Sequence, residues 1–261
     1  MWIKLAVVVG LLGVFLYLSR KVFTSSAWKR YQLRRASMLA AKGQIQKMIR
    51  YLERNMDRSS VSDPLTNALV FFHIRSGQLD RAEELVMDAM ERGDGSGRAV
   101  AQLGYIAAGR DRREEAEQYY RRALKLDPEL GSTVNVNLAA MLIEDDRDLE
   151  EAEKLLNQAL ELREGSSRSG VHINLALLYM KRGRPRQALV QALTGYELMP
   201  AQRVTARSRA NALAIAARAY RDQGEGEESA RLASKALKTL EEVETPEDDR
   251  LYTELSHLAG S

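Results

Sequence analysis

The sequence of 261 residues contains no cysteine, only five prolines and only three histidines. Without cysteine the chain has no disulfide, no thiolate metal site and no cysteine nucleophile. Few prolines combined with abundant Ala, Leu, Glu, Arg and Lys favour helix at both buried and exposed positions. A hydrophobic content of 45% is enough to bury a core. The composition therefore excludes a disordered chain and predicts an all-α protein.

Acidic residues are absent from residues 1–52, which contain ten basic residues; the first acid is Glu53. The whole chain has a formal net charge of +3 and this segment one of +10, so the remainder has a net charge of −7. The pI near 9.0 thus comes from the N-terminal segment. A body of negative net charge argues against a nucleic-acid partner.

The N-terminal segment has an uncharged, apolar run from Leu5 to Leu18, between Lys4 and Arg20. As a helix it spans roughly 22 Å, and snorkelling of the two flanking cations closes part of the gap to a hydrocarbon core of about 30 Å. We predict an uncleaved transmembrane helix. The alternative is a signal peptide cleaved near Ala27, but the charges at positions 20 and 21 would lie between its apolar run and its cleavage site.

Positive charge is concentrated on the C-terminal side of this run, which predicts that residues 20–261 face the cytoplasm. The same charges are suited to anionic lipid headgroups at the membrane surface. Their alternative role is that of a solvated basic linker, and the two roles are compatible. The predicted membrane-surface residues are Arg20, Lys21, Lys29, Arg30, Arg34 and Arg35.

The rest of the sequence repeats at a period of about 34 residues. The segment LGYIAAGRDRREEAEQYYRRALKLDP, which starts at Leu103, has counterparts that start at Leu69, Ala139, Leu175 and Ala216. Small residues recur in the second half of each unit with spacings of 34, 36, 36 and 41, at Ala82, Ala116, Ala152, Ala188 and Ser229. A small residue at a helix crossing lets two axes approach to about 8–10 Å. Each unit is therefore predicted to be a pair of packed helices.

This pattern resembles the tetratricopeptide repeat in its Leu103-Gly104 pair, in Ala116, Tyr120 and Ala123, and in the closing Asp127-Pro128. The resemblance implies a right-handed superhelical solenoid of helix-turn-helix repeats, whose first helices line a concave groove. Residues 203–223 are expected to form one long first helix, and the last helix to begin with Thr245 as N-cap and Pro246 in its first turn. The expected organisation is a single transmembrane anchor in residues 1–23, a basic juxtamembrane region with a degenerate first repeat in 24–65, five repeats in 66–240 and a capping helix in 241–261.

Residues suited to catalysis are few. His73, His172 and His257 are widely separated, and we assign them structural roles. The motifs of zinc proteases, phosphate-binding loops and nucleophile elbows are all missing from the sequence. We therefore predict that the protein is not an enzyme and has no cofactor, metal or small-molecule substrate.

The predicted groove is the candidate site for a protein or peptide partner. Aligning the units on their small residues puts Tyr105, Met141 and Leu177 at one first-helix position, as an apolar row. Asn137, Asn174 and Asn211 fall at neighbouring positions, where an amide can pair with a peptide backbone. Lys181 and Arg218 complete the predicted groove. The alternative is that the asparagines bond within the helices and that the apolar row is packing.

These observations predict a membrane-anchored scaffold or adaptor that recruits or organises a partner protein through the groove of its repeats. The alternative function is that of an exported or periplasmic repeat protein that helps to assemble an envelope or secretion complex. The two functions differ in the side of the membrane on which the repeats lie and in the partner.

Overall fold

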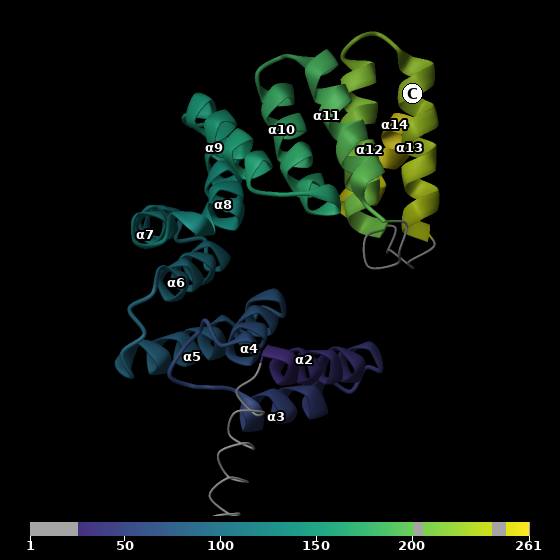
Figure 1. Cartoon of the computed structure of the whole chain (residues 1–261). Coiled ribbons are helices and arrows are strands. Elements are labelled where there is room, and N and C mark those ends of the chain that lie inside the picture. Colours follow the sequence, from purple (N-terminus) through teal and green to yellow (C-terminus); the bar gives the residue numbers. More distant parts are fainter. Residues whose placement is uncertain (1–25, 201–205, 242–248, 261) are drawn as a thin grey trace, which may run out of the picture. The chain divides into compact units, whose positions relative to one another are not determined.

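The computed structural model describes residues 26–200, 206–241 and 249–260, and every regular element in these ranges is helical (Figure 1). The chain divides into two compact units, unit 1 (Met1–Asp127) and unit 2 (Pro128–Ser261). The helices of unit 1 are α2 (Ser26–Ala41), α3 (Ile45–Asn55), α4 (Pro64–Arg75), α5 (Leu79–Glu91), α6 (Gly97–Gly109) and α7 (Arg113–Leu126). The helices of unit 2 are α8 (Gly131–Glu144), α9 (Leu149–Glu161), α10 (Ser169–Lys181), α11 (Pro185–Leu198), α12 (Ala206–Arg221), α13 (Gly226–Glu241) and α14 (Arg250–Ala259), with short 3-10 turns at Pro128–Leu130 and Gly165–Arg168.

Unit 1 consists of three helix pairs, α2–α3, α4–α5 and α6–α7. The small residues predicted at the crossings, Ala82 of α5 and Ala116 of α7, are fully buried. In α3 the corresponding residue, 34 positions before Ala82, is the buried Met48. Its longer side chain packs with Leu52 and Leu65 into a core shared by the first two pairs. The first pair is therefore a repeat-like unit with an altered crossing.

The start of α4 shows how neighbouring pairs are joined. Asp63 is the N-cap, and its carboxylate accepts hydrogen bonds from the backbone N–H groups of Leu65 and Thr66, each at 3.1 Å. Pro64 follows at the first helical position, where the missing N–H costs nothing. Lys29 of α2 donates to the same carboxylate, which is almost fully buried. One acidic side chain thus caps α4 and anchors α2 to it.

Unit 2 has three further pairs, α8–α9, α10–α11 and α12–α13, followed by α14. Ala152 and Ala188 are fully buried at their crossings, and Ser229 is nearly so. Helix α14 packs on α13 and α12, and it buries Leu255 and Leu258 in their core. An all-helical arrangement of repeated pairs is therefore present in both units.

One predicted boundary is corrected by the structure. The last helix begins at Arg250 and not at Pro246, because Asp249 is extended and its side chain accepts the N–H of Leu251 as an N-cap. The long first helix predicted for residues 203–223 corresponds to α12, which spans Ala206–Arg221. Its predicted start lies outside the described residues, because 201–205 are not described. Thr245 lies outside them as well, as does the predicted anchor in residues 1–23. Along the described ranges, no helix combines the length and the apolar character needed to cross a membrane.

Candidate functional site

A common turn ends every first helix and defines which positions are equivalent. At its tip one residue has positive φ and donates its N–H to the carbonyl three residues earlier, while the next N–H bonds to the carbonyl five residues earlier. The tip residues are Gly43, Gly77, Asp111, Asp146, Gly183 and Gly224. Six positions before them lie Ser37, Phe71, Tyr105, Ala140, Leu177 and Arg218. These six residues therefore occupy equivalent positions in their first helices. An alignment on the small residues of the second helices gives a different set.

This register corrects the place of Met141 in the predicted apolar row. Ala140 holds the position of Tyr105, and Met141 is buried with 7% exposure. The reason is the loop after α8, which has one residue more than the loop after α6 and uses Asp148 as a second residue with positive φ. An alignment on Ala116 and Ala152 therefore misplaces α8 by one residue.

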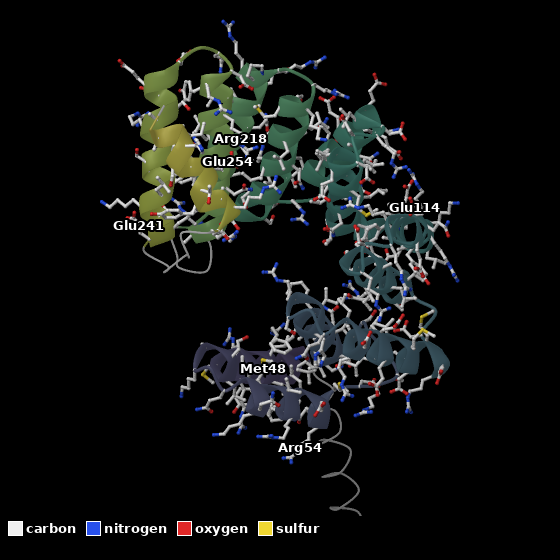
Figure 2. The ribbon with its side chains drawn as sticks, turned by 180° about the vertical axis from the view of Figure 1, so that it is seen from behind. Met48, Arg54, Glu114, Arg218, Glu241 and Glu254 are labelled. Atoms are coloured by element: carbon white, nitrogen blue, oxygen red, sulfur yellow. The ribbon has the colours of Figure 1, made fainter. Side chains whose placement is uncertain are left out.

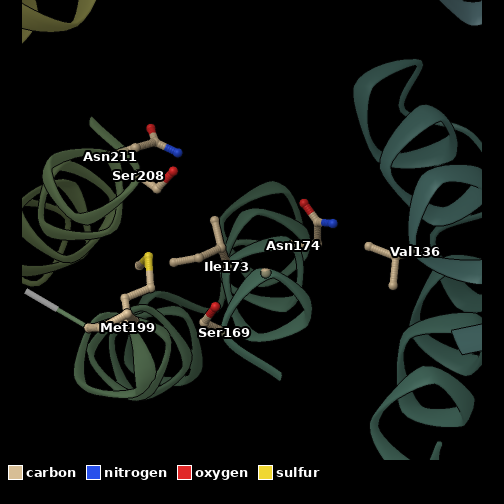
Figure 3. Close-up of a pocket in the computed structure, with 9 residues that line it drawn as sticks. Val136, Ser169, Ile173, Asn174, Met199, Ser208 and Asn211 are labelled. Carbon is tan, nitrogen blue, oxygen red and sulfur yellow. The ribbon is translucent and has the colours of Figure 1, made fainter. Parts of the chain in front are cut away.

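The first-helix face of unit 2 contains a hollow of about 440 Å³. Its walls come from α8 (Val136), α10 (Ile173, Asn174), the end of α11 (Met199) and α12 (Asn211) (Figure 3). The hollow is partly apolar, and Ser169 and Ser208 add hydroxyl groups to its lining. It therefore offers both apolar surface and hydrogen-bonding groups to a ligand.

Two of the predicted asparagines are available in this hollow. The side-chain amides of Asn174 and Asn211 are half-buried and form no hydrogen bond with any described residue. The third, Asn137, donates to the carbonyl of Thr133, one turn earlier in its own helix, at 3.1 Å. The structure thus brings together Asn174 and Asn211, while Asn137 follows the alternative of bonding within its helix.

The remaining predicted groove residues of unit 2 have other contacts. Leu177 is half-buried and packs on the core formed by α10, α12 and α13. Lys181 lies 3.9 Å from the carboxylate of Asp146. Arg218 forms an ion pair with Glu254 of α14, beside which it lies in Figure 2. Arg218 therefore links α12 to the last helix.

In unit 1, the half-buried Tyr105 packs its ring 5.4 Å from the ring of the buried Tyr120. The equivalent residue of α4 is Phe71, which is 57% exposed. Phe71 is not among the predicted groove residues, although its place 34 residues before Tyr105 is a signal in the sequence that points to it. Phe71 and Tyr105 come from α4 and α6, which contact each other.

The predicted membrane-surface residues fall into three groups. Arg20 and Lys21 lie outside the described residues. Lys29 is bound to Asp63, and the Arg35 guanidinium lies 5.1 Å from the centre of the Tyr51 ring. These two cations thus have structural contacts within unit 1. Arg30 and Arg34 are exposed.

Two of the three histidines, His73 and His172, contact a glutamine side chain, as expected of structural residues. His73 Nδ1 lies 2.7 Å from Gln78 Oε1, and His172 Nδ1 lies 2.7 Å from Gln191 Oε1. His257 is exposed on α14. In the part of the chain that the structure describes, no group of three His, Asp or Glu side chains is placed to hold a metal ion.

Comparison with known proteins agrees with this architecture. The family model of the tetratricopeptide repeat matches residues 97–130, which include α6 and α7. Among curated proteins, none has a sequence significantly similar to this chain.

Solved structures with a similar fold include BtubC from P. vanneervenii, with a TM-score of 0.59 and 18% identity over 86% of this chain and 93% of that one. A chain of the APC/C hetero-tetramer Cut9–Hcn1 matches with a TM-score of 0.67 and 15% identity over 93% of this chain and 45% of its own length. Yeast Tom70 matches with a TM-score of 0.60 and 18% identity over 87% of this chain and 46% of its own. The chain thus spans slightly less than half of the last two proteins.

These findings define the class of the protein. The chain contains a tetratricopeptide repeat, and its described helices have the fold of a tetratricopeptide-type solenoid. Arrays of this kind use the surface formed by successive repeats for binding other proteins.

Proposed function

We propose that this chain is a membrane-anchored adaptor that binds a partner protein in the hollow of unit 2. The observation that carries the proposal is the pair of amides, on Asn174 and Asn211, without a hydrogen-bond partner among the described residues. An amide offers both a donor and an acceptor, as a peptide backbone does. The apolar Ile173 and Met199 lie beside them and supply contact area for a side chain.

The size of the hollow is consistent with a peptide segment as ligand. A volume of about 440 Å³ holds one or two side chains rather than a folded domain. The hollow is lined by three successive first helices, so a segment that crosses them contacts several repeats at once. This favours recognition of an extended or helical segment of the partner.

The membrane anchor is the second part of the proposal, and it rests on the sequence of Leu5–Leu18 and on the flanking charges of Arg20 and Lys21. The charge difference between the two flanks favours a cytoplasmic location for both units. An anchor of this kind would confine the partner to the membrane surface. The adaptor would then act by fixing where its partner works.

The partner site is tested by crosslinking and then by binding. A photo-crosslinking amino acid is placed at Ser208, at the hollow, and at Gln187, which is exposed on the second helix α11. We expect a crosslinked partner in native membranes from the first position only. With that partner purified, Asn174→Ala and Asn211→Ala should each weaken binding by about 1–3 kcal/mol, because a polar group of the partner loses its hydrogen bond.

Gln187→Ala is the matched control and should leave the affinity unchanged, and all variants should keep wild-type helicity. If the partner binds both asparagine variants as tightly as the wild type, the hollow is not its binding site.

The anchor is tested separately. The full chain should remain with membranes in alkaline carbonate and begin at Met1 by intact mass, and a tag after Ser261 should be protected from protease in intact cells. A soluble product that begins near Ala27 would contradict the anchor. An accessible tag on an uncleaved chain would favour the exported assembly factor instead.

A further inference from the structure

Charge is unequally divided between the first and second helices of unit 1. The first helices α2, α4 and α6 contain no Asp or Glu, whereas the second helices α3, α5 and α7 together contain nine acidic and eight basic residues. The basic residues of the three first helices are Lys29, Arg30, Arg34, Arg35, Arg75 and Arg98. Because α4 contacts both α2 and α6, the first helices form one face of unit 1 whose helices carry no Asp or Glu.

Five of these six cations have no acidic partner among the described residues, and four of the five make no other contact of this kind either. Lys29 is bound to Asp63 and Arg35 lies over Tyr51, as described above. Each of the other four is exposed and forms no ion pair or hydrogen bond with a described residue: Arg30, Arg34, Arg75 and Arg98. In the register of the common turn, the residues at positions 30 and 98 are equivalent. The first-helix face thus has uncompensated positive charge on all three of its helices.

The same face has an exposed apolar side chain and an unsatisfied polar atom. Phe71 of α4 is 57% exposed, one turn before Arg75. Gln102 of α6 is 5% exposed; its Nε2 donates to Asn67 Oδ1 at 2.9 Å, and its Oε1 has no partner. Turning the amide round would leave the nitrogen unpaired instead. In the register of the common turn, Gln102 is equivalent to Asn174, which lines the hollow of unit 2.

We propose that the first-helix face of unit 1 binds an acidic segment of a protein, with an apolar side chain of that segment placed on Phe71. Carboxylates of the segment pair with the four arginines, and a backbone N–H satisfies the buried oxygen of Gln102. Arginine is suited to this task because its planar guanidinium binds a carboxylate through two parallel hydrogen bonds. The inference rests on the proposed function as a partner-binding adaptor and names the chemistry of a partner segment for unit 1.

The observations favour a peptide over an anionic bilayer as the occupant of this face. The unpaired acceptor on Gln102 needs a donor, which a peptide backbone supplies at every residue except proline. The exposed Phe71, one turn before Arg75, also provides an apolar anchor of the kind that dominates peptide interfaces.

The test uses the full chain in phosphatidylcholine nanodiscs and a short fluorescein-labelled peptide of Asp and Glu around a central Phe-Leu pair. A matched peptide carries Asn and Gln in place of the acids. We expect the acidic peptide to bind, the neutral one to bind at least tenfold more weakly, and the affinity to fall as salt is raised. Equal binding of the two peptides, or no binding of the acidic peptide, would overturn the proposal.

Variants then locate the binding surface. Phe71→Ala should weaken binding of the acidic peptide about tenfold, and so should the double variant Arg34→Gln, Arg98→Gln. The matched controls are on second helices of the same unit, where Met87→Ala removes an exposed apolar side chain and Arg122→Gln an exposed charge. The controls should bind like the wild type, and the same loss in all four variants would contradict a site on this face.

Hydrogen exchange distinguishes the peptide from lipid. The acidic peptide should slow exchange in α4 and α6, whereas phosphatidylserine added to the nanodiscs without peptide should not. Protection of these helices by the lipid alone would make this face a membrane surface and sink the proposal. Loss of partner binding by Asn174→Ala with unchanged binding of the acidic peptide would separate this site from the hollow of unit 2.

Discussion

Helix α6 packs closely on α7 where Gly104 meets the ring of Tyr120, so we expect a larger side chain at position 104 to destabilise unit 1. A Cβ atom built at Gly104 would lie 2.6 Å from two carbons of the Tyr120 ring, well inside ordinary contact distance. The ring has no free space to move into, since it is 1% exposed and packs against Tyr105. Overpacking of this kind costs about 1–3 kcal/mol. Alanine in a helix regains about 0.5–1 kcal/mol relative to glycine. Gly104→Ala should therefore destabilise unit 1 by a net of about 1 kcal/mol, from the midpoints of the two ranges, and by at most about 2.5 kcal/mol.

The assay is urea unfolding of the full chain, followed by far-ultraviolet circular dichroism. Gly170→Ala is the matched control, because a Cβ at that position in α10 meets no atom within 4 Å. The control should be unchanged or more stable by up to about 1 kcal/mol. If Gly104→Ala is as stable as its control, the close approach of α6 to Tyr120 does not exist in solution.

Three further predictions address the repeat contacts. Ala152→Leu adds methylenes at a fully buried crossing and should lower the free energy of unfolding by about 1–3 kcal/mol in the same urea assay. Burial raises the pKa of Tyr120, so the folded state resists its deprotonation. Its contribution to the free energy of unfolding should be fully present below the unfolded pKa of about 10 and be lost as the pH rises above it. Thermal melts of Tyr120→Phe should therefore lose less stability at high pH than those of the wild type. Burial alone would raise the pKa of Glu153, but hydrogen bonds from Tyr179 and Arg182 lower it. Its contribution is therefore present above the unfolded pKa of about 4.3 and lost in acid, and melts of Glu153→Gln should depend less on pH between about 5 and 3.

The helix pairs were predictable from the sequence because they depend on local patterns. A small residue at each crossing leaves a visible period, as Ala82 and Ala116 show, and both are buried as expected. The start of the last helix was harder to predict. Thr245-Pro246 and Asp249 are both reasonable caps, and packing of Leu255 and Leu258 on the preceding helices does not distinguish between them.

The candidate site was less predictable because it depends on register across loops. One extra residue after α8 was enough to shift Met141 out of the register of Tyr105. Leu177 keeps that register because the loop after α10 has the same length as the loop after α6. Phe71 was visible in principle from its spacing of 34 residues to Tyr105. Its exposure depends on how α4 packs against its neighbours, which composition does not reveal.

Ion pairs between distant residues were beyond sequence reasoning. Lys29 pairs with Asp63, 34 residues away, and Arg218 with Glu254, 36 residues away. In the sequence each cation looks like an available surface charge. Only the stacking of one repeat on the next shows that both serve to join helices, and that Arg34 and Arg98 remain available to a partner.

The longer loop after α8 has a consequence for protein engineering. Its extra residue is absorbed in the turn at Asp146 and Asp148, while the helices on either side keep their buried faces. Length at this point is therefore nearly independent of the core. An affinity tag or a small folded domain inserted between residues 146 and 148 should be displayed without disturbing the repeats.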